Sequence, residues 1–241
     1  MAIQQTTQLY KDYATDGVTV KALRGIDLTI DRGEFSALAG PSGSGKTTLL
    51  NIIGGLDHPT NGQVTVNDIL LNDQSAKELA RIRLNRIGFI FQAYNLIPVL
   101  TALENVEYIL LLQGIEKEER YRRSSQILEE VGLGNELDRR PQELSGGQQQ
   151  RVAVARAIVS QPDIVLADEP TANLDQKTGA MLLDMMHDLN KKKGITFLFS
   201  THDQMVMERA ERLLHLVDGQ ISGDERKTRK KTTKKTQKKK K

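Results

Sequence analysis

The stretch ALAGPSGSGKTTLL, residues 37–50, places three glycines, one lysine and several hydroxyl side chains between two apolar runs. A glycine inside a helix costs about 1 kcal/mol relative to alanine, and it offers no side chain for packing. The segment is therefore unsuited to the interior of a helix or strand. It predicts a loop in which bare backbone is needed.

The spacing of Gly40, four further residues, Gly45, Lys46 and Thr47 is that of a phosphate-binding loop. Glycines let backbone N–H groups turn toward an anion, and a helix starting at Lys46 points its unpaired N–H groups at the same place. Lys46 adds a positive charge, and the Thr47 hydroxyl can ligate Mg²⁺. We expect a buried strand at residues 35–39 and a helix at residues 46–53. A Gly/Ser linker is the alternative, which the apolar helix directly after it disfavours.

The composition bounds the class of protein. With 241 residues and 38% hydrophobic content, the chain can form one large domain or two lobes. It has no cysteine, which excludes disulfides and thiolate metal sites and fits a reducing compartment. The longest purely aliphatic run, residues 109–112, is far shorter than the ~18 residues of a membrane span. We expect a soluble chain that is not exported.

The formal net charge of +3 hides an uneven distribution. Residues 226–241 hold 11 of the 34 Lys and Arg residues and no acid, so the remainder has 23 basic against 31 acidic residues, a net charge of −8. An acidic body argues against a specific nucleic-acid partner. The basic tail, taken as residues 222–241, is expected to be disordered and able to touch an anionic membrane surface.

Local patterns predict the order of elements. Residues 18–23 and 26–30 are rich in β-formers and precede a turn at residues 31–33, and a hairpin of residues 63–66 and 69–71 is expected after an Asn61-Gly62 turn. Residues 101–133 have two successive helical patterns. From residue 151 strands and helices alternate, which indicates a parallel sheet.

Four apolar runs end at polar side chains. FSALA leads to the phosphate loop, IGFIF to Gln92, DIVLA to Asp168 and Glu169, and ITFLFS to Thr201 and His202. Ligands of open parallel sheets bind beyond the carboxyl ends of the strands, so we expect these four ends to converge.

The carboxylate pair predicts metal and water chemistry. Asp168 would hold Mg²⁺ through its water shell, and Glu169 would polarise the attacking water as general base. Both could instead be turn acids before Pro170. His202 at a fourth strand end is expected to touch the terminal phosphate, although such a histidine can also be a cap or a core residue. Tyr13 could be a strand aromatic or a flat surface for a base.

A second glycine-rich helix start occurs in LSGGQ, residues 144–148. Ser145 is a good N-cap, and Gly146 and Gly147 expose the backbone, so this helix end predicts a second anion site. A plain capped helix with a glycine turn is the alternative.

Together these motifs resemble the nucleotide-binding domain of ABC-type ATPases. The resemblance rests on GPSGSGKT, Gln92, LSGGQ, DIVLADEP, the NLD of residues 173–175 and His202, and it covers about residues 5–221. It implies an α/β fold with a P-loop NTPase core around a parallel sheet, an antiparallel β lobe and a helical, signature-motif lobe at about residues 94–160. It also implies an ATP-binding domain over residues 1–221, with ATP and Mg²⁺ as cofactors.

The resemblance also implies individual roles. Catalysis would depend on Lys46, Glu169 and His202, and the metal on Thr47, Gln92 and Asp168. ATP contacts would come from Tyr13, which would stack on adenine, and from Gly40, Pro41, Ser42, Gly43, Ser44, Gly45, Lys46, Thr47, Thr48 and Gln92. In this family the signature motif completes the site of a second subunit. Ser145, Gly146, Gly147, Gln148 and Asp175 would therefore contact ATP across a homodimer that forms on ATP binding.

The stretch IGFIFQAYNLIPVLTALENV is similar to the subfamily of lipoprotein release, macrolide export and antimicrobial-peptide export, and to the cell-division ATPase. In those systems the segment after Gln92 receives a short helix of an integral membrane permease subunit. The side chains of Tyr94, Leu96, Ile97, Pro98 and Leu100 could line such a groove, or they could pack the helical lobe. The resemblance implies a cytoplasmic protein, peripheral on the cytoplasmic face of the inner or plasma membrane.

The function implied is ATP hydrolysis that drives conformational change in a membrane partner. A division-type ATPase that moves no substrate is the alternative within the family. A DNA-associated ABC ATPase would interrupt the core with coiled coils, and no sustained heptad run lies between residues 48 and 144. A translation-factor type would need two cores. A binding module without hydrolysis is disfavoured by Glu169.

Overall fold

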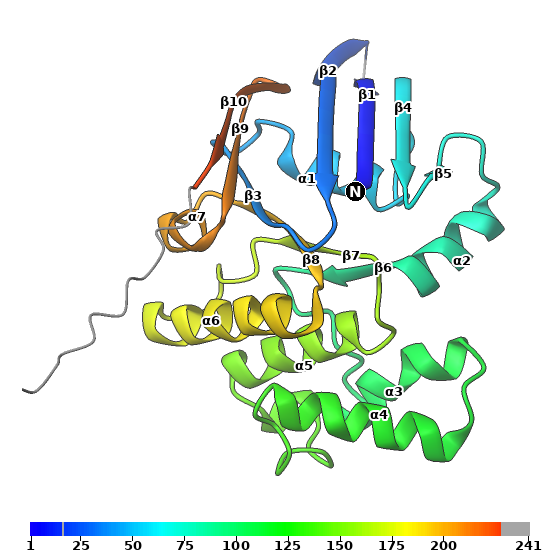
Figure 1. Cartoon of the computed structure of the whole chain (residues 1–241), viewed down its shortest axis with the longest axis vertical. Coiled ribbons are helices and arrows are strands. Elements are labelled where there is room, and N and C mark those ends of the chain that lie inside the picture. The colour runs from blue at the N-terminus through cyan, green and yellow to red at the C-terminus, as the bar shows by residue number, and fades with distance from the viewer. Residues whose placement is uncertain (16, 228–241) are drawn as a thin grey trace, which may run out of the picture.

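Two β-sheets form the framework of the computed structural model, which describes residues 1–15 and 17–227 (Figure 1). The first is antiparallel, with the strand order β2-β1-β4-β5, and the second has the order β10-β9-β3-β8-β7-β6. The strands of the first sheet are β1 (Ala2–Thr15), β2 (Val18–Asp31), β4 (Asn61–Val66) and β5 (Ile69–Leu70). Those of the second are β3 (Phe35–Ala39), β6 (Ile87–Ile90), β7 (Ile164–Asp168), β8 (Thr196–Thr201), β9 (Arg212–Val217) and β10 (Gln220–Arg226).

The helices cover the six-stranded sheet. They are α1 (Lys46–Ile53), α2 (Ala76–Arg86), α3 (Ala102–Leu112), α4 (Lys117–Glu130), α5 (Gly146–Ile158), α6 (Gln176–Lys193) and α7 (Gln204–Arg209), with a short 3-10 turn at Pro141–Glu143. Figure 1 shows α3 to α6 on the opposite side of this sheet from β1, β2 and β4. The chain is therefore an α/β protein, as predicted.

Strand β3 explains how the sheet joins two cores. All five of its residues are buried, and its side chains alternate between the two faces. Leu38 packs with α1 and the antiparallel sheet, whereas Phe35 and Ala37 pack with the helices of the other face. Because both faces are covered, the strand is a continuous apolar run, which is typical of a buried parallel sheet.

Several predicted elements are confirmed. The strand at residues 35–39 and the helix at residues 46–53 are β3 and α1, with the same bounds. Strands β9, β3, β8, β7 and β6 pair in parallel, as the alternation after residue 151 indicated. The helical patterns of residues 101–133 correspond to α3 and α4, and α3 begins with a capping box between Thr101 and Glu104.

The Asn61-Gly62 turn was a wrong prediction. The two residues are the first two of β4. The hairpin predicted from residues 63–66 and 69–71 is confirmed, because β4 pairs antiparallel with β5, and Asn67 and Asp68, which have positive φ, form its turn. Gly62 has a φ of 88°, and a Cβ there would lie 2.0 Å from the Gln8 carbonyl oxygen. The glycine therefore permits close approach of β4 to β1 beside an irregularity in their register.

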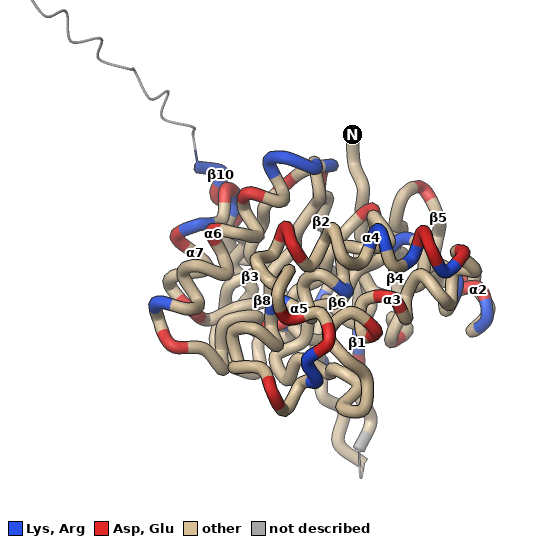
Figure 2. The backbone as a smooth tube through the Cα atoms, turned by 90° about the horizontal axis from the view of Figure 1, so that it is seen from below, with Lys and Arg blue, Asp and Glu red and all other residues tan. Residues whose placement is uncertain are grey.

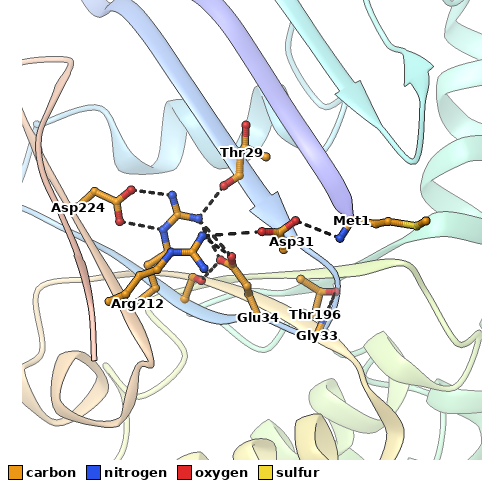
Figure 3. Close-up of polar contacts among 10 residues, drawn as sticks. Met1, Thr29, Asp31, Gly33, Glu34, Thr196, Arg212 and Asp224 are labelled. Carbon is orange, nitrogen blue, oxygen red and sulfur yellow. Dashed lines mark hydrogen bonds and ion pairs between the residues drawn. The ribbon is translucent and has the colours of Figure 1, made fainter. Parts of the chain in front are cut away.

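The predicted tail begins too early. Residues 222–226 belong to β10, which pairs antiparallel with β9. Arg212 of β9 explains part of this order, because it is 7% exposed and donates to both carboxylate oxygens of Asp224, at 2.8 and 2.7 Å. The same guanidinium donates to Glu34 and to the Thr29 carbonyl oxygen, which ties the hairpin to both sheets (Figure 3). The prediction for residues 228–241 lies outside the described residues.

Arg212 and its partners influence each other's titration. Hydrogen bonding to Arg212 lowers the pKa of Asp224 below its ordinary value, and hydrogen bonding to Asp224 raises the pKa of Arg212.

Basic and acidic residues are interspersed along the described backbone in the view of Figure 2. Among the helices of the described residues, none combines the length and the apolar composition of a membrane span.

Candidate nucleotide-binding site

The carboxyl ends of four neighbouring strands open onto one cavity of about 720 Å³. Thr47 follows β3, Gln92 follows β6, Glu169 follows β7 and His202 follows β8, and all four line the cavity. The other lining residues are Val20, Lys21, Ala22, Arg24, Pro41, Ser42, Gly43, Gly45, Lys46, Thr48, Ser200, Asp218 and Gly219. The predicted convergence of the strand ends is confirmed.

The glycine-rich loop forms one wall of the cavity. Gly45 is the N-cap of α1 with a φ of 102°, and no side chain caps the first N–H groups of this helix. The ammonium of Lys46 donates to the carbonyl oxygens of Gly40 and Pro41, at 2.8 and 2.9 Å. A helix start with uncapped N–H groups and a lysine in its first turn is an arrangement that binds phosphate.

Two predicted contact residues of this loop lie behind its surface. Gly40 does not line the cavity; a Cβ there would lie 2.1 Å from the Leu216 carbonyl oxygen, so the glycine is needed for packing. Ser44 is 3% exposed, and its hydroxyl has no hydrogen-bond partner in the described part of the chain. Its position leaves the loop's backbone, rather than this hydroxyl, facing the cavity.

Thr47 and Asp168 supply hard oxygen donors at the cavity edge. The Thr47 hydroxyl lies 3.1 and 3.3 Å from the two carboxylate oxygens of Asp168. A hydroxyl and a carboxylate suit Mg²⁺, which binds through one or two carboxylates and takes its remaining ligands from water and phosphates. Residues 1–15 and 17–227 contain no cluster of three or more His, Cys, Asp or Glu residues that could hold a metal. A site made of Thr47 and Asp168 does not require such a cluster.

Glu169 is held from three directions. Its φ is 46°, its N–H donates to the Ser200 carbonyl oxygen at 2.9 Å, and its Oε2 accepts from the Thr201 hydroxyl at 3.3 Å. Its Oε1 lies 2.6 Å from Nδ1 of His202. The Glu169 side chain is 14% exposed and that of His202 is 70% exposed. A mostly buried carboxylate thus faces an accessible imidazole across the ends of β7 and β8, and it can accept a proton from a water at the cavity.

Tyr13 lies outside the lining of this cavity. Its hydroxyl donates to Asp57 at 2.8 Å, and the Lys11 ammonium lies 4.7 Å from the ring centroid. Burial raises the pKa of Tyr13. Asp57 also accepts from Lys11 at 2.7 Å, so one carboxylate fixes both side chains. Sequence reasoning missed Asp57 and Lys11, because neither belongs to a motif.

The second glycine-rich helix start lies apart from the cavity. Ser145 is the N-cap of α5, as predicted, and forms a capping box with Gln148. None of residues 145–148 lines the cavity. A Cβ at Gly147 would lie 2.4 Å from the Thr178 methyl group, and Thr178 donates to Asp175, the N-cap of α6. The start of α5 and Asp175 therefore lie close to each other, outside the lining of the nucleotide cavity.

A second cavity, of about 390 Å³, lies beside the segment that follows β6. Its apolar lining includes Phe91, Ile97 and Tyr108. Of the five side chains that could line a partner groove or pack the helical lobe, only Ile97 lines this cavity. Leu96 packs instead against the main core, and the other three, Tyr94, Pro98 and Leu100, are not among the lining residues. The apolar pattern alone could not separate the two faces of this segment.

Comparisons with known proteins agree with this geometry. Residues 23–172 match the family model described as ABC transporter. The chain is 44% identical over 225 residues to an uncharacterized ABC transporter ATP-binding protein of Thermotoga maritima, covering 93% of this chain and 96% of the relative. It is 45% identical over 217 residues to the lipoprotein-releasing system ATP-binding protein LolD of Syntrophus aciditrophicus, covering 90% and 97%.

Solved structures with the same fold include dimers. The ATP-binding cassette MJ0796, from Methanocaldococcus jannaschii, has been solved as a dimer in a post-hydrolysis state bound to ADP and phosphate. This structure matches with a TM-score of 0.85 and 44% identity, covering 92% of this chain and 98% of that chain.

Proposed function

The chain belongs to the ABC transporter family as an ATP-binding cassette and ATPase, and from this we propose that it hydrolyses ATP to drive conformational change in a membrane-protein partner. The observation that carries the proposal is the convergence of Lys46, Glu169 and His202 on one cavity beside a glycine-rich helix start. We assign the nucleotide site to the domain of residues 1–221.

In this proposal the residues of the cavity have distinct roles. The backbone N–H groups of Gly43, Gly45, Lys46 and Thr47 and the Lys46 ammonium bind the phosphates and stabilise the charge on the transferred phosphoryl group. Thr47 and Asp168 would hold Mg²⁺, assisted by Gln92, and the ion would neutralise phosphate charge. Tyr13 would stack on adenine from the edge of the site.

Glu169 and His202 act on the attacking water. The Glu169 carboxylate accepts the proton of a water that attacks the terminal phosphate. The Nδ1 of His202, 2.6 Å from Oε1, keeps the carboxylate oriented, and the exposed ring is free to approach the phosphate. The left-handed backbone at Glu169 supports this reading, because strained conformations cluster at active sites.

We also propose that two copies of the chain pair when ATP binds. The chain has two glycine-rich helix starts, at α1 and at α5, and of these only the start of α1 lines the nucleotide cavity. Ser145, Gly146, Gly147, Gln148 and Asp175 would then contact the ATP of the partner copy. The dimeric structures of the MJ0796 cassette support this arrangement.

We further propose a partner in the membrane. The apolar groove beside Phe91, Ile97 and Tyr108 would receive a short helix of a permease subunit, which would place the chain on the cytoplasmic face of the membrane. The names of the LolD relatives support a lipoprotein-release or related export system. Nine Lys and Arg residues in residues 228–241 would add electrostatic attraction to an anionic leaflet.

Phosphate release by the purified chain tests the enzymatic part. Mg²⁺-dependent hydrolysis of ATP should be abolished in Lys46→Ala. The matched control is Lys77→Ala, which changes an exposed lysine of α2 and should keep wild-type activity. Absence of hydrolysis by the wild-type chain, or equal activity of Lys46→Ala and wild type, would contradict the proposal.

A further inference from the structure

The backbone that follows Gln92 has an unusual conformation. Tyr94 and Asn95 are consecutive non-glycine residues with φ of 58° and 50°, a region that L-amino acids avoid. Their carbonyl oxygens both accept hydrogen bonds from Arg156 of α5, at 2.8 Å for Tyr94 and 2.5 Å for Asn95. The Gln92 carbonyl oxygen accepts from the side chain of Asn173 at 2.8 Å. The segment makes two hydrogen bonds of its own, from the Tyr94 N–H to the Phe91 carbonyl oxygen and from the Asn95 N–H to the Ala93 carbonyl oxygen, and side chains of distant residues bind its remaining carbonyl oxygens.

The Arg156 guanidinium binds this segment and forms no ion pair in the described part of the chain. None of the ion pairs within residues 1–15 and 17–227 includes its guanidinium, and burial lowers its pKa. A partly buried cation without a counter-ion is costly unless polar groups replace its lost hydration. The carbonyl oxygens of Tyr94 and Asn95 are the groups that do so here.

The segment lies between the two cavities. Phe91, Asn95 and Ile97 line the apolar groove, as does Arg156 itself, whereas Gln92 lines the nucleotide cavity. A change in the backbone at residues 94–95 would therefore move groups in both places at once.

Tyr94 connects the same segment to the glycine-rich start of α5. A Cβ at Gly146 would lie 2.9 Å from the Tyr94 hydroxyl, so the phenol rests against the bare backbone of α5 at its first turn. At this position Tyr94 has a left-handed backbone, and its carbonyl oxygen accepts a hydrogen bond from Arg156. The position of the Tyr94 side chain can thus determine how accessible the Gly146 N–H group is.

We propose that Arg156 is a positioning residue for ATP hydrolysis. It holds Tyr94 and Asn95 in the left-handed conformation, and this conformation places Gln92 at the nucleotide cavity and the Tyr94 phenol against Gly146. The inference rests on the proposed function, because it assumes that Gly146 serves the ATP site of a second copy. Loss of the guanidinium should impair dimerisation and turnover, and it should leave ATP binding to the cavity of the single chain unchanged.

The test compares Arg156→Ala and Arg156→Lys with a matched control. Arg123→Ala also removes a guanidinium that donates to a backbone carbonyl, that of Val159 at 2.7 Å on the opposite end of α5 from Ser145. For each full-length variant we would measure kcat, KM, the Kd of a fluorescent ATP analogue and the thermal melting curve. ATP-induced dimerisation would be measured by light scattering in the Glu169→Gln background.

The expected result is a split between binding and turnover. Arg156→Ala should lower kcat about tenfold or more, because small displacements far from the chemistry have large effects. It should leave the analogue's Kd within about twofold of wild type and should weaken dimerisation. Arg156→Lys should recover part of the loss, since an ammonium can still donate to one or both carbonyls. Arg123→Ala should match wild type in kcat.

Two results would overturn the inference while leaving the proposed function standing. One is a kcat of Arg156→Ala within twofold of an active wild type. The other is an equal loss of kcat and analogue affinity, which would indicate general damage. An inactive wild type would instead contradict the proposed function itself. If Arg156→Ala fails to fold, Tyr94→Ala tests the same contact: it should reduce dimerisation with unchanged analogue affinity, and unaltered dimerisation would overturn the inference.

Discussion

The Glu169 carboxylate and the His202 imidazole are joined by a contact of 2.6 Å between Oε1 and Nδ1. The two residues directly follow neighbouring parallel strands, β7 and β8, whose register pairs Asp168 with Ser200. Because the two paired strands end side by side, the strand pairing brings the Glu169 and His202 side chains close to each other. The arrangement gives Glu169 a fixed orientation toward the cavity while His202 stays accessible.

His202→Ala should therefore impair turnover more than binding. Without the imidazole the Glu169 carboxylate loses one of its two side-chain contacts, and we expect kcat to fall by about 100-fold with analogue affinity within about twofold. The control is His215→Ala, which removes a histidine paired at 3.3 Å with Glu225 on the β9–β10 hairpin. Steady-state phosphate release measures both. Equal kcat values for the two variants would remove His202 from the mechanism.

Dimerisation should depend on the helix start at Ser145. In the Glu169→Gln background with ATP and Mg²⁺, light scattering should detect a dimer, and adding Ser145→Arg should abolish it because the larger side chain blocks the exposed N–H groups of α5. Ser75 is the matched control, since it forms the same capping box at the start of α2. A dimer that persists with Ser145→Arg, or that Ser75→Arg abolishes equally, would contradict contact across the interface.

Arg212 should stabilise the fold. Arg212→Ala leaves the carboxylates of Glu34 and Asp224 without their shared partner, and we expect the free energy of unfolding to fall by about 2–4 kcal/mol. Arg122→Ala removes an exposed pair with Glu119 and should have a much smaller effect on the free energy of unfolding. Urea denaturation measures both values. Equal effects would mean that burial adds nothing to the Arg212 contacts.

The same cluster predicts the direction of a pH effect. Because Arg212 lowers the pKa of Asp224, this carboxylate contributes stability that is fully present above its unfolded pKa of about 3.9. The contribution is lost as pH falls through the lower folded value. The stability difference between wild type and Asp224→Asn should therefore shrink below about pH 4. A constant difference from pH 7 to pH 2 would contradict this linkage.

Truncation after Lys227 should reduce binding to anionic membranes and leave ATPase activity nearly unchanged. The cut removes nine Lys and Arg residues but keeps β10 and the Asp224 contact, so ATPase activity should stay within about twofold. Sedimentation with anionic vesicles should fall at low salt, because each basic residue contributes about 1 kcal/mol near such a surface. For the full chain the attraction should vanish near 1 M salt, where the screening length is ~3 Å. Vesicle binding that survives truncation would exclude a membrane role for the tail.

The parts of the fold that the sequence predicted are those with local signals. The glycine-rich loop separates β3 from α1, and the strong contrast between bare backbone and apolar runs fixed both sets of bounds. The convergence of Thr47, Gln92, Glu169 and His202 followed from a general property of parallel sheets. Ser145 could be predicted as a cap because N-capping depends on a few neighbouring residues.

The parts that the sequence did not predict depend on contacts between distant segments. Arg212 donates to the carbonyl of Thr29, 183 residues away, and no local pattern indicates such a contact. Asp57, which binds Tyr13, lies in a loop without a motif. The Asn61-Gly62 pair has the composition of a turn, but pairing of β4 with β1 places it inside a strand. In each case tertiary packing decided between locally acceptable alternatives.

A single-turnover measurement on Glu169→Gln tests the central claim most directly. The amide keeps the size of the carboxylate but cannot accept the proton of the attacking water, so we predict that ATP hydrolysis slows by about 100-fold or more. Analogue affinity should stay within about twofold of wild type, and Glu129→Gln, an exposed change on α4, should hydrolyse ATP at the wild-type rate. Hydrolysis by Glu169→Gln within a few-fold of wild type would contradict the assignment of this carboxylate as the general base.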